Sequence, residues 1–469
     1  MGSPAQRCLA VLSSLIAWSS AVLSIPHRKQ HATETDNTSV IPFGAVMPDC
    51  GAMTDIDVPR TSALQEPVAR VPAYWARYWT LANFGIFMAY FATQQVLLPR
   101  HTNEVTDNVS SAAVSAQSLA NLVAALVTVV VSILAGAFSD RTLNRRGRRQ
   151  PWVLYGTALA AVAFVFQGLQ DGVLGIVLGW AVFQVGYAAV SVALQTAVPD
   201  EVPVNQRATI SGYQGVAQSV GPVAGVVVLT LLLTGILDAY VGLAVLMFVL
   251  VIPFALYTRG IPLERSERPP LDLKAIVVGV VAPLKHADFA WAFGQRFMIQ
   301  LSNALAQIFL YQYLKDEVHT DPDNGTLVLI LIYTVAVVAI AVPSGRRSDK
   351  SGKRKRMVVV ASVLQASAAL LFAFVPQMPA AIVGAAILGL GYGAYLSVDQ
   401  ALVTQVLPHA ADRGKDLGVI QIANSLPYVF AAGAGGWLIN SFGFPTLFLA
   451  SFFAGLAAAF LVMPIKSVA

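Results

Sequence analysis

The chain has 469 residues, of which 56% are hydrophobic and only 12% are charged, and its mean hydropathy is +0.65. Soluble domains carry about 25% charged residues, so this composition excludes a single water-soluble domain and indicates a protein embedded in a bilayer. The net charge of +5 comes from short basic clusters between apolar stretches, which argues against nucleic-acid binding. Both cysteines, Cys8 and Cys50, precede the apolar region, and the sequence has no histidine or cysteine cluster, so we expect no disulfide framework, metal site or cofactor.

Twelve segments are apolar over the roughly 20 residues that a membrane-spanning helix needs. They cover residues 74–98, 111–138, 151–170, 174–198, 208–234, 239–257, 288–313, 325–343, 357–376, 379–407, 416–439 and 443–464. We therefore expect an all-α membrane protein with twelve transmembrane helices. The predicted organisation is a leader (1–72), an N-terminal six-helix bundle (73–257), a central loop (258–287) and a C-terminal six-helix bundle (288–469).

The leader is read separately from the apolar core. Residues 10–23 are apolar and follow Arg7, which resembles a secretory signal, and the polar stretch 27–70 is typical of disorder. A cleaved signal would place the first span outside the cell, against the charge pattern described next. We therefore favour a non-native or misassigned leader, with translation starting at Met53; a genuine leader is the alternative.

Basic residues sort to alternate loops. The loops after the second, fourth, eighth and tenth segments and the central loop hold twenty of them, whereas the opposite loops hold only Arg100 and Lys315. Because cytoplasmic loops are enriched in lysine and arginine, we expect both ends of the twelve-helix core to lie in the cytoplasm of a cell-membrane protein.

The sequence contains an internal repeat. One set of loop residues follows the second segment: Gly136, Asp140, Arg141, Arg145, Gly147, Arg148 and Arg149. A matching set follows the eighth: Gly345, Asp349, Lys350, Gly352, Lys353 and Arg354. Arg207 and Gly212 recur as Arg413 and Gly418 at nearly the same offset, which indicates duplication. Transporters are often built from such repeats, with the substrate site between them.

The second loop, Gly345-x-x-x-Asp349-Lys350-x-Gly352-Lys353-Arg354-Lys355, resembles the signature loop of the major facilitator superfamily. The first loop, from Ser139 to Pro151, resembles the version found in glycoside–pentoside–hexuronide cation symporters and the related sucrose transporters. The resemblance covers residues of about 74–464 and implies a secondary transporter of the major facilitator fold. It also implies that the two loops gate the cytoplasmic side. An aspartate at a helix end can face the N-terminus of a neighbouring helix, and arginines beside it can pair with it or with lipid phosphates. Such contacts would latch the two halves together on the cytoplasmic side in one state and break in the other. The alternative is that these residues only orient the chain in the membrane.

Polar side chains recur at helical spacing inside several segments, where they are costly and usually functional. Arg296, Gln300, Asn303 and Gln307 lie on one face of the seventh segment. The resemblance implies that the first, fourth, seventh and tenth helices line a central cavity. The predicted cavity residues are Gln94, Gln184, Tyr187, Gln214, Gln300, Asn303, Gln307, Tyr392, Tyr395, Gln421 and Asn424. Amides and phenols bind hydroxyl groups without fixed charge, which suits a neutral polyol; the alternative is that they only join helices.

One carboxylate, Asp399, lies well inside a predicted span. Arg296 lies at a matching depth in the seventh segment, about eight residues from the same side, so we expect the two to pair directly or through water. A carboxylate that loses and regains such a partner can carry a proton. A structural clamp, a snorkelling arginine and sodium coupling are the alternatives. No histidine lies inside a predicted span, which argues against a histidine relay.

These features favour a cation-coupled, proton-driven symporter of a sugar or glycoside that works by alternating access as a monomer. A proton-driven exporter of drugs or metabolites is the first alternative, and a transport-inactive sensor or interaction protein is the second. An enzyme is not expected, because the sequence has no nucleophile–base set, phosphate loop or metal-ligand spacing.

Overall fold

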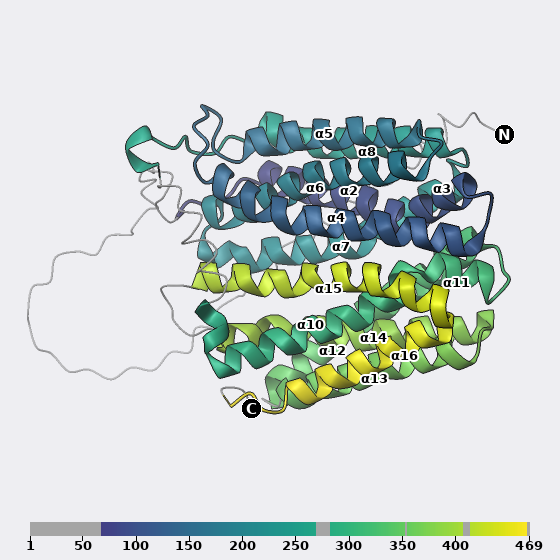
Figure 1. The fold of residues 1–469 in the computed structure, drawn as a ribbon. Coiled ribbons are helices and arrows are strands. Elements are labelled where there is room, and N and C mark those ends of the chain that lie inside the picture. Colours follow the sequence, from purple (N-terminus) through teal and green to yellow (C-terminus); the bar gives the residue numbers. More distant parts are fainter. Residues whose placement is uncertain (1–66, 269–281, 352–353, 407–412, 467–469) are drawn as a thin grey trace, which may run out of the picture. The chain divides into compact units, whose positions relative to one another are not determined.

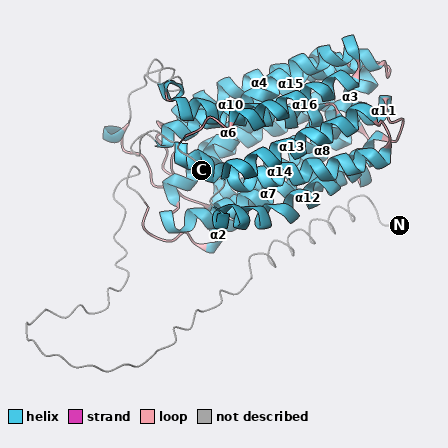
Figure 2. Cartoon of the chain, turned by 90° about the horizontal axis from the view of Figure 1, so that it is seen from below, coloured by secondary structure: helices cyan, strands magenta, loops and turns pink. Residues whose placement is uncertain are grey.

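The computed structural model describes residues 67–268, 282–351, 354–406 and 413–466, and all regular elements in these ranges are helices (Figures 1 and 2). The first span is continuous through α2 (Ala73–Ala92), η1 (Thr93–Leu97) and α3 (Leu98–Val105). The N-terminal half continues with α4 (Ser110–Ser139), α5 (Gln150–Gly168), α6 (Val173–Glu201), α7 (Val204–Leu231) and α8 (Ile236–Tyr257). The short 3₁₀ turns η2 (Arg265–Glu267) and η3 (Ala282–Lys285) precede the second half.

The C-terminal half begins with α10 (Ala287–Ile308), which breaks at Phe309 before α11 (Leu310–Asp316). It continues with α12 (Pro322–Ser351), α13 (Arg354–Phe374), α14 (Met378–Val406), α15 (Arg413–Phe442) and α16 (Phe444–Leu461). Glycine and proline mark the turns: Gly172, Gly235 and Pro203 precede helices, and Gly443 joins α15 to α16 with a φ of 84°, which favours glycine.

Both halves pair their helices in the same pattern. In the first half, α2 packs on α7 and α8, and α6 and α8 both pack on α5, with α4 against α6. In the second, α10 packs on α15 and α16, and α14 and α16 both pack on α13, with α12 against α14. The halves meet through α4 with α15 and α7 with α12, which are reciprocal helices of the repeat. This shared pattern confirms two related six-helix bundles.

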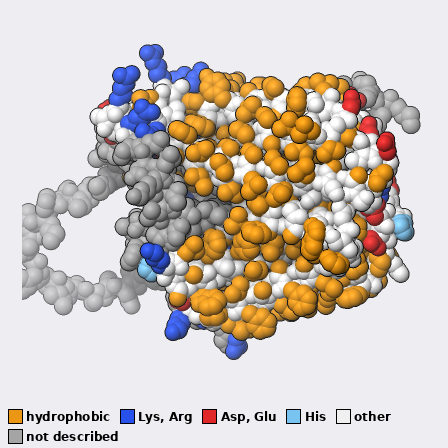
Figure 3. Space-filling view, viewed as in Figure 1, with side chains coloured by type: hydrophobic (Ala, Val, Ile, Leu, Met, Phe, Trp, Pro, Cys, Tyr) orange, Lys and Arg blue, Asp and Glu red, His pale blue; other side chains and the backbone are white. Residues whose placement is uncertain are grey.

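Ten helices in the described ranges are long and apolar enough to cross a membrane. The other two predicted spans correspond to α10 with α11, whose polar side chains lower its hydropathy, and to α15, which is interrupted by amides and glycines. Apolar side chains cover the face seen in Figure 3, and α4, α5 and α8 each carry exposed large hydrophobic residues. Because these side chains would be costly in water, they indicate a multi-pass membrane protein with a lipid-facing surface.

Charged side chains gather at the two ends of the helices (Figure 3). We call the end that carries the loop between α4 and α5 the basic end. The opposite end, where α3 and α11 lie in Figure 1, carries Glu104, Asp171, Asp238, Asp316 and Asp323 and is called the acidic end.

Candidate functional site

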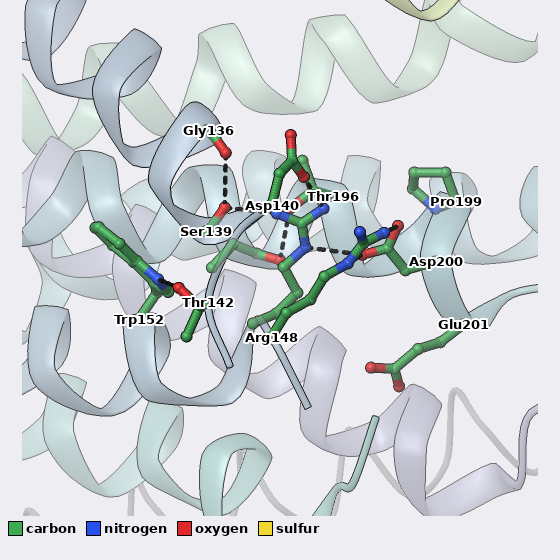
Figure 4. Close-up of polar contacts among 12 residues, drawn as sticks. Gly136, Ser139, Asp140, Thr142, Arg148, Trp152, Thr196, Pro199, Asp200 and Glu201 are labelled. Carbon is green, nitrogen blue, oxygen red and sulfur yellow. Dashed lines mark hydrogen bonds and ion pairs between the residues drawn. The ribbon is translucent and has the colours of Figure 1, made fainter. Parts of the chain in front are cut away.

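At the basic end, the loop after α4 is tied to the last turn of α6 by ion pairs (Figure 4). Arg148 Nη2 lies 2.6 Å from Asp200 Oδ1, and Arg149 Nε lies 2.7 Å from Asp200 Oδ2. Arg149 Nη2 also lies 2.5 Å from Asp140 Oδ1, and Arg149 Nη1 donates a hydrogen bond to Ser139. Asp200 is thus shared by two arginines, in the geometry that makes charge-assisted hydrogen bonds strong.

Gly147 allows the loop to turn back onto α5. Its φ is 106°, and a Cβ there would lie 2.8 Å from the Cα of Gly260, which is backbone and cannot move aside. The Gly260 N–H donates a hydrogen bond to the Arg146 carbonyl at 2.9 Å, so the loop also contacts the segment after α8. Glycine is therefore required at position 147 by both conformation and space.

The predicted gating residues have different surroundings. Arg141 is half-buried and Arg145 is exposed, whereas Arg149 is only 3% exposed. The contacts of Asp140, Arg148 and Arg149 lie within the N-terminal half, where a contact between halves was expected for a cytoplasmic latch. In the second loop, the described side chains do not include the predicted ones of Gly345, Asp349, Lys350, Gly352 and Lys353, and Arg354 begins α13. Asp200 was not among the predicted gating residues. Its position at the end of a predicted span was the feature of the sequence that could have identified it.

In the middle of the N-terminal half, tyrosines and amides converge on the face of α2 and α6. The Tyr90 hydroxyl is hydrogen-bonded to the side chains of Gln94 and Gln184, and that of Tyr187 to Ser191. Gln94 lies in η1, a π-helical turn. Such turns are frequent at functional sites because they re-aim side chains.

The C-terminal half presents a similar group. Gln307 donates a 2.9 Å hydrogen bond to Asn303, and the hydroxyl of Tyr333 on α12 is hydrogen-bonded to both side chains. Tyr392 on α14 stacks on Tyr333 with ring centroids 6.2 Å apart. Tyr333 was not predicted, because it is a single polar residue in an otherwise apolar span.

The two groups meet between the halves and together form what we call the central cluster: Tyr90, Gln94, Gln95, Gln184, Tyr187, Asn303, Gln307, Tyr333, Tyr392 and Tyr428. Gln95, also in η1, donates a 3.4 Å hydrogen bond to Gln307 across the interface. Tyr428 on α15 lies near Tyr90, Tyr187 and Tyr392. The cluster thus joins side chains of both halves near the middle of their helices.

The other predicted cavity residues are more scattered. Gln300 and Tyr395 are buried on α10 and α14, at 7% and 1% exposure, and Tyr395 contacts Tyr392. Gln214 is half-buried on α7, and the described hydrogen bonds do not connect it to the cluster. Gln421 falls in α15, where its side chain lies outside the described ones.

Arg296 is buried on α10, at 5% exposure, and its Nε donates a 2.7 Å hydrogen bond to Asn424 Oδ1 on α15. The expected partner Asp399 falls on α14, but its side chain lies outside the described ones. Arg296 and Asn424, both predicted separately, are therefore brought together in the C-terminal half. A buried guanidinium is costly unless it is well paired, so this contact is expected to fix its position.

At the acidic end, polar contacts join the two halves. Arg100 Nη2 lies 2.8 Å from Asp323 Oδ1, and Arg100 is also hydrogen-bonded to Tyr311. Ser110 donates to Asp316 at 2.5 Å, and Lys315 donates to Asn103. We call these contacts the acidic-end latch. They show that the halves are held together at the acidic end.

The first span extends further than expected, and one prediction is wrong as a result. α3 continues the helix to Val105, so His101 lies inside a membrane-spanning candidate and is only 3% exposed. Its Nε2 lies 2.9 Å from the Gln170 carbonyl and its Nδ1 lies 3.4 Å from the Tyr240 hydroxyl, all within the N-terminal half. The span was predicted to end before Arg100 and His101 because hydropathy falls there. The structure continues the helix through both residues, because the burial of His101 and the partial burial of Arg100 against neighbouring helices compensate for it.

Comparison with known proteins agrees with this architecture. The family model of the Major Facilitator Superfamily matches residues 8–226, 71–283 and 292–468. The niacin transporter NiaP of Acinetobacter baylyi (strain ATCC 33305 / BD413 / ADP1) is 27% identical over 199 residues, which cover 42% of this chain and 44% of that protein. The chain thus matches less than half the length of that relative.

Two solved structures show the same fold. The nucleoside transporter NupG has a TM-score of 0.63 at 14% identity, covering 83% of this chain and 98% of that one. The POT family transporter PepTSo has a TM-score of 0.66 at 11% identity, covering 84% and 98%.

Proposed function

Because the chain belongs to the major facilitator superfamily and is a membrane transporter, not an enzyme, we propose that it moves a small polar solute, a sugar or glycoside, by proton symport. The observation that carries the proposal is the central cluster. Amides and phenols from both halves meet there, and Gln95 bonds Gln307 across the interface. A solute bound between two bundles that rock against each other is exposed to one side of the membrane at a time.

The chemistry of the cluster supports a neutral, hydroxyl-rich solute. Its amides and tyrosines both donate and accept hydrogen bonds. Between its two ends the N-terminal half has no charged residue, since Arg77, Arg100, Asp200 and Glu201 all lie near the helix ends. A solute with a fixed charge would find no opposite charge on the N-terminal side of the cluster. An unpaired charge is costly in a site of low dielectric.

Coupling is assigned to Asp399 and Arg296. The sequence predicts both at matching depth in the C-terminal half, and the hydrogen bond from Arg296 to Asn424 joins two of the predicted site residues. We propose that Asp399 takes up a proton when the site opens to the more acidic side and releases it at the other. We also propose that the basic end faces the cytoplasm of the cell membrane, as the distribution of basic residues predicts, and that the chain works as a monomer.

The test is uptake into proteoliposomes, with wild type beside Asp399→Asn, against mono- and disaccharides, glycosides, nucleosides and nicotinate. The expected result is sugar or glycoside accumulation driven by an inward proton gradient, with the variant retaining only exchange of solute down its gradient. Nicotinate transport alone would replace the proposed solute class with the one named for the relative NiaP. Proton leak without inward movement of any solute would favour an exporter. A variant that accumulates solute normally would make Asp399 a structural residue.

The second alternative, a transport-inactive sensor or interaction protein, rests on residues 1–72. Deleting them and measuring the same uptake tests it. Transport retained in full would remove this alternative, and binding of solutes without movement of any of them would favour it.

A further inference from the structure

Aromatic rings form a stacked array in the N-terminal half that the proposed function has not used. Phe164 on α5 stacks on Phe183 of α6 with centroids 4.1 Å apart, and Phe183 stacks on Trp180 at 5.0 Å, both with interplanar angles of 3°. All three rings are fully buried. Trp180 also donates a 3.2 Å hydrogen bond to Asn121 on α4, so the array is fixed from several helices.

The array continues to the interface between the halves. Tyr90 stacks on Trp180 at 5.8 Å and on Tyr187 at 4.6 Å, with interplanar angles of 16° and 18°. Trp180 and Tyr187 are seven residues apart on α6, which corresponds to a rise of roughly 10 Å. The centroid distances from Tyr90 to Trp180 and from Tyr90 to Tyr187 add up to about the same length. Tyr90 therefore lies between them. Among the described side chains the array ends at Tyr187, which is half-buried and lies near Tyr428 of the other half.

Hydrogen-bond acceptors without partners belong to the same central cluster. The side-chain carbonyl oxygens of Gln95 and Gln184 are buried and have no hydrogen-bond partner in the described structure. A buried acceptor left unpaired costs free energy, so each of these oxygens needs a donor, from water or from a bound solute. Two carbonyl acceptors beside the rings favour a solute that donates O–H groups.

From these two observations we infer that the preferred solute is a glycoside carrying a flat aromatic group. The aromatic ring stacks on Tyr187, and the sugar hydroxyls donate to Gln95 and Gln184. This inference rests on the proposed function and narrows its solute class. The same chemistry occurs in aryl O-glycosides and in nucleosides, where the ring is joined to the sugar through nitrogen.

Ring contact gives a measurable preference. An aromatic pair contributes beyond its buried area, and loss of a stacking ring weakens binding by a few-fold to more than tenfold. We expect phenyl glycosides to bind roughly tenfold more tightly than methyl glycosides of the same sugar. The preference belongs to the ring of Tyr187, so Tyr187→Phe keeps it and Tyr187→Leu reduces it to about twofold or less.

The experiment measures binding of methyl and phenyl glucosides, methyl and phenyl galactosides, uridine and adenosine to the purified full-length chain by titration calorimetry. Wild type, Tyr187→Phe and Tyr187→Leu are compared after each elutes as a single species in gel filtration. Binding of the methyl glycoside serves as the internal standard for a folded site. Uptake of each bound compound into proteoliposomes then separates ligands from transported solutes.

The outcomes separate the two proposals. A phenyl preference lost only in Tyr187→Leu supports the inference, and nucleosides binding in place of phenyl glycosides, with the same loss, assign the nitrogen-linked source. Methyl and phenyl glycosides that bind equally to wild type, or a preference that survives in Tyr187→Leu, overturn the inference and leave sugar transport standing. If no sugar, glycoside or nucleoside binds, the proposed function itself fails.

Discussion

The acidic-end latch predicts how far one ion pair shifts the balance between the two access states. Arg100 and Asp323 belong to different halves, and their side chains are 15% and 28% exposed. Hydrogen bonds to charged groups contribute about 1.5–3 kcal/mol when buried, and exposed ion pairs contribute about 1 kcal/mol or less. For this partly exposed pair, about 1 kcal/mol is appropriate, which corresponds to roughly a fivefold change in the ratio of the two states.

The natural chain offers a direct assay, because its only cysteines are Cys8 and Cys50. With both replaced by serine, Gln94→Cys places a single thiol in the central cluster. A membrane-impermeant maleimide added on the acidic-end side then labels this thiol in proportion to the time that end is open. Asp323→Asn is expected to raise the labelling rate about fivefold.

A matched control and a rescue complete the test. Asp238→Asn removes an exposed carboxylate at the same end that lies outside the described contacts between halves, and it should leave the rate unchanged. Exchanging the charges, Arg100→Asp with Asp323→Arg, should return the rate toward that of the parent. Equal rates in the parent and Asp323→Asn would refute the assignment of this pair to the latch.

Three further predictions concern stability and packing. Asp200→Asn should lower the free energy of unfolding by about 3 kcal/mol, because it leaves two arginines of the basic-end loop without their shared carboxylate. Asp140→Asn should lower it by less than about 1 kcal/mol, because the Asp140 side chain is 49% exposed. Denaturant titration of both variants in detergent compares the two. Gly147→Ala should destabilise by at least about 1 kcal/mol because of its positive φ and its contact with backbone, and an unchanged unfolding midpoint would contradict that account. Gly436→Ala should weaken the packing of α15 on α4, since its Cβ would lie 2.5 Å from the side chain of Ser118. The readout is faster protease cleavage of the segment that joins the two halves.

Much of the fold was predictable because each span carries its own signal. The polar face of α10 was visible from the spacing of Arg296, Gln300 and Asn303, and the structure buries all three. Hydropathy and periodicity are local properties, so they locate a helix and its polar face from a short window of sequence.

The partners of those faces were less predictable. Arg148 and Arg149 were predicted in a gating loop, but their carboxylate, Asp200, lies about 50 residues away on another helix. Tyr333 joins the central cluster only because α12 packs beside α14. Contacts of this kind depend on tertiary packing, which no single window of one sequence contains.

The π-helical turn at Thr93–Leu97 has a consequence for the rotational phase of the first span. A π turn holds one more residue than an α turn, so everything after it is rotated by about 100° relative to an uninterrupted α-helix. Tyr90 before the turn faces the aromatic array, and Arg100 after it faces Asp323 of the other half. Deleting one residue within the turn would leave α2 in place and rotate α3 away from the latch. The length of a five-residue segment thus keeps the solute site and the acidic-end closure in register on a single helix.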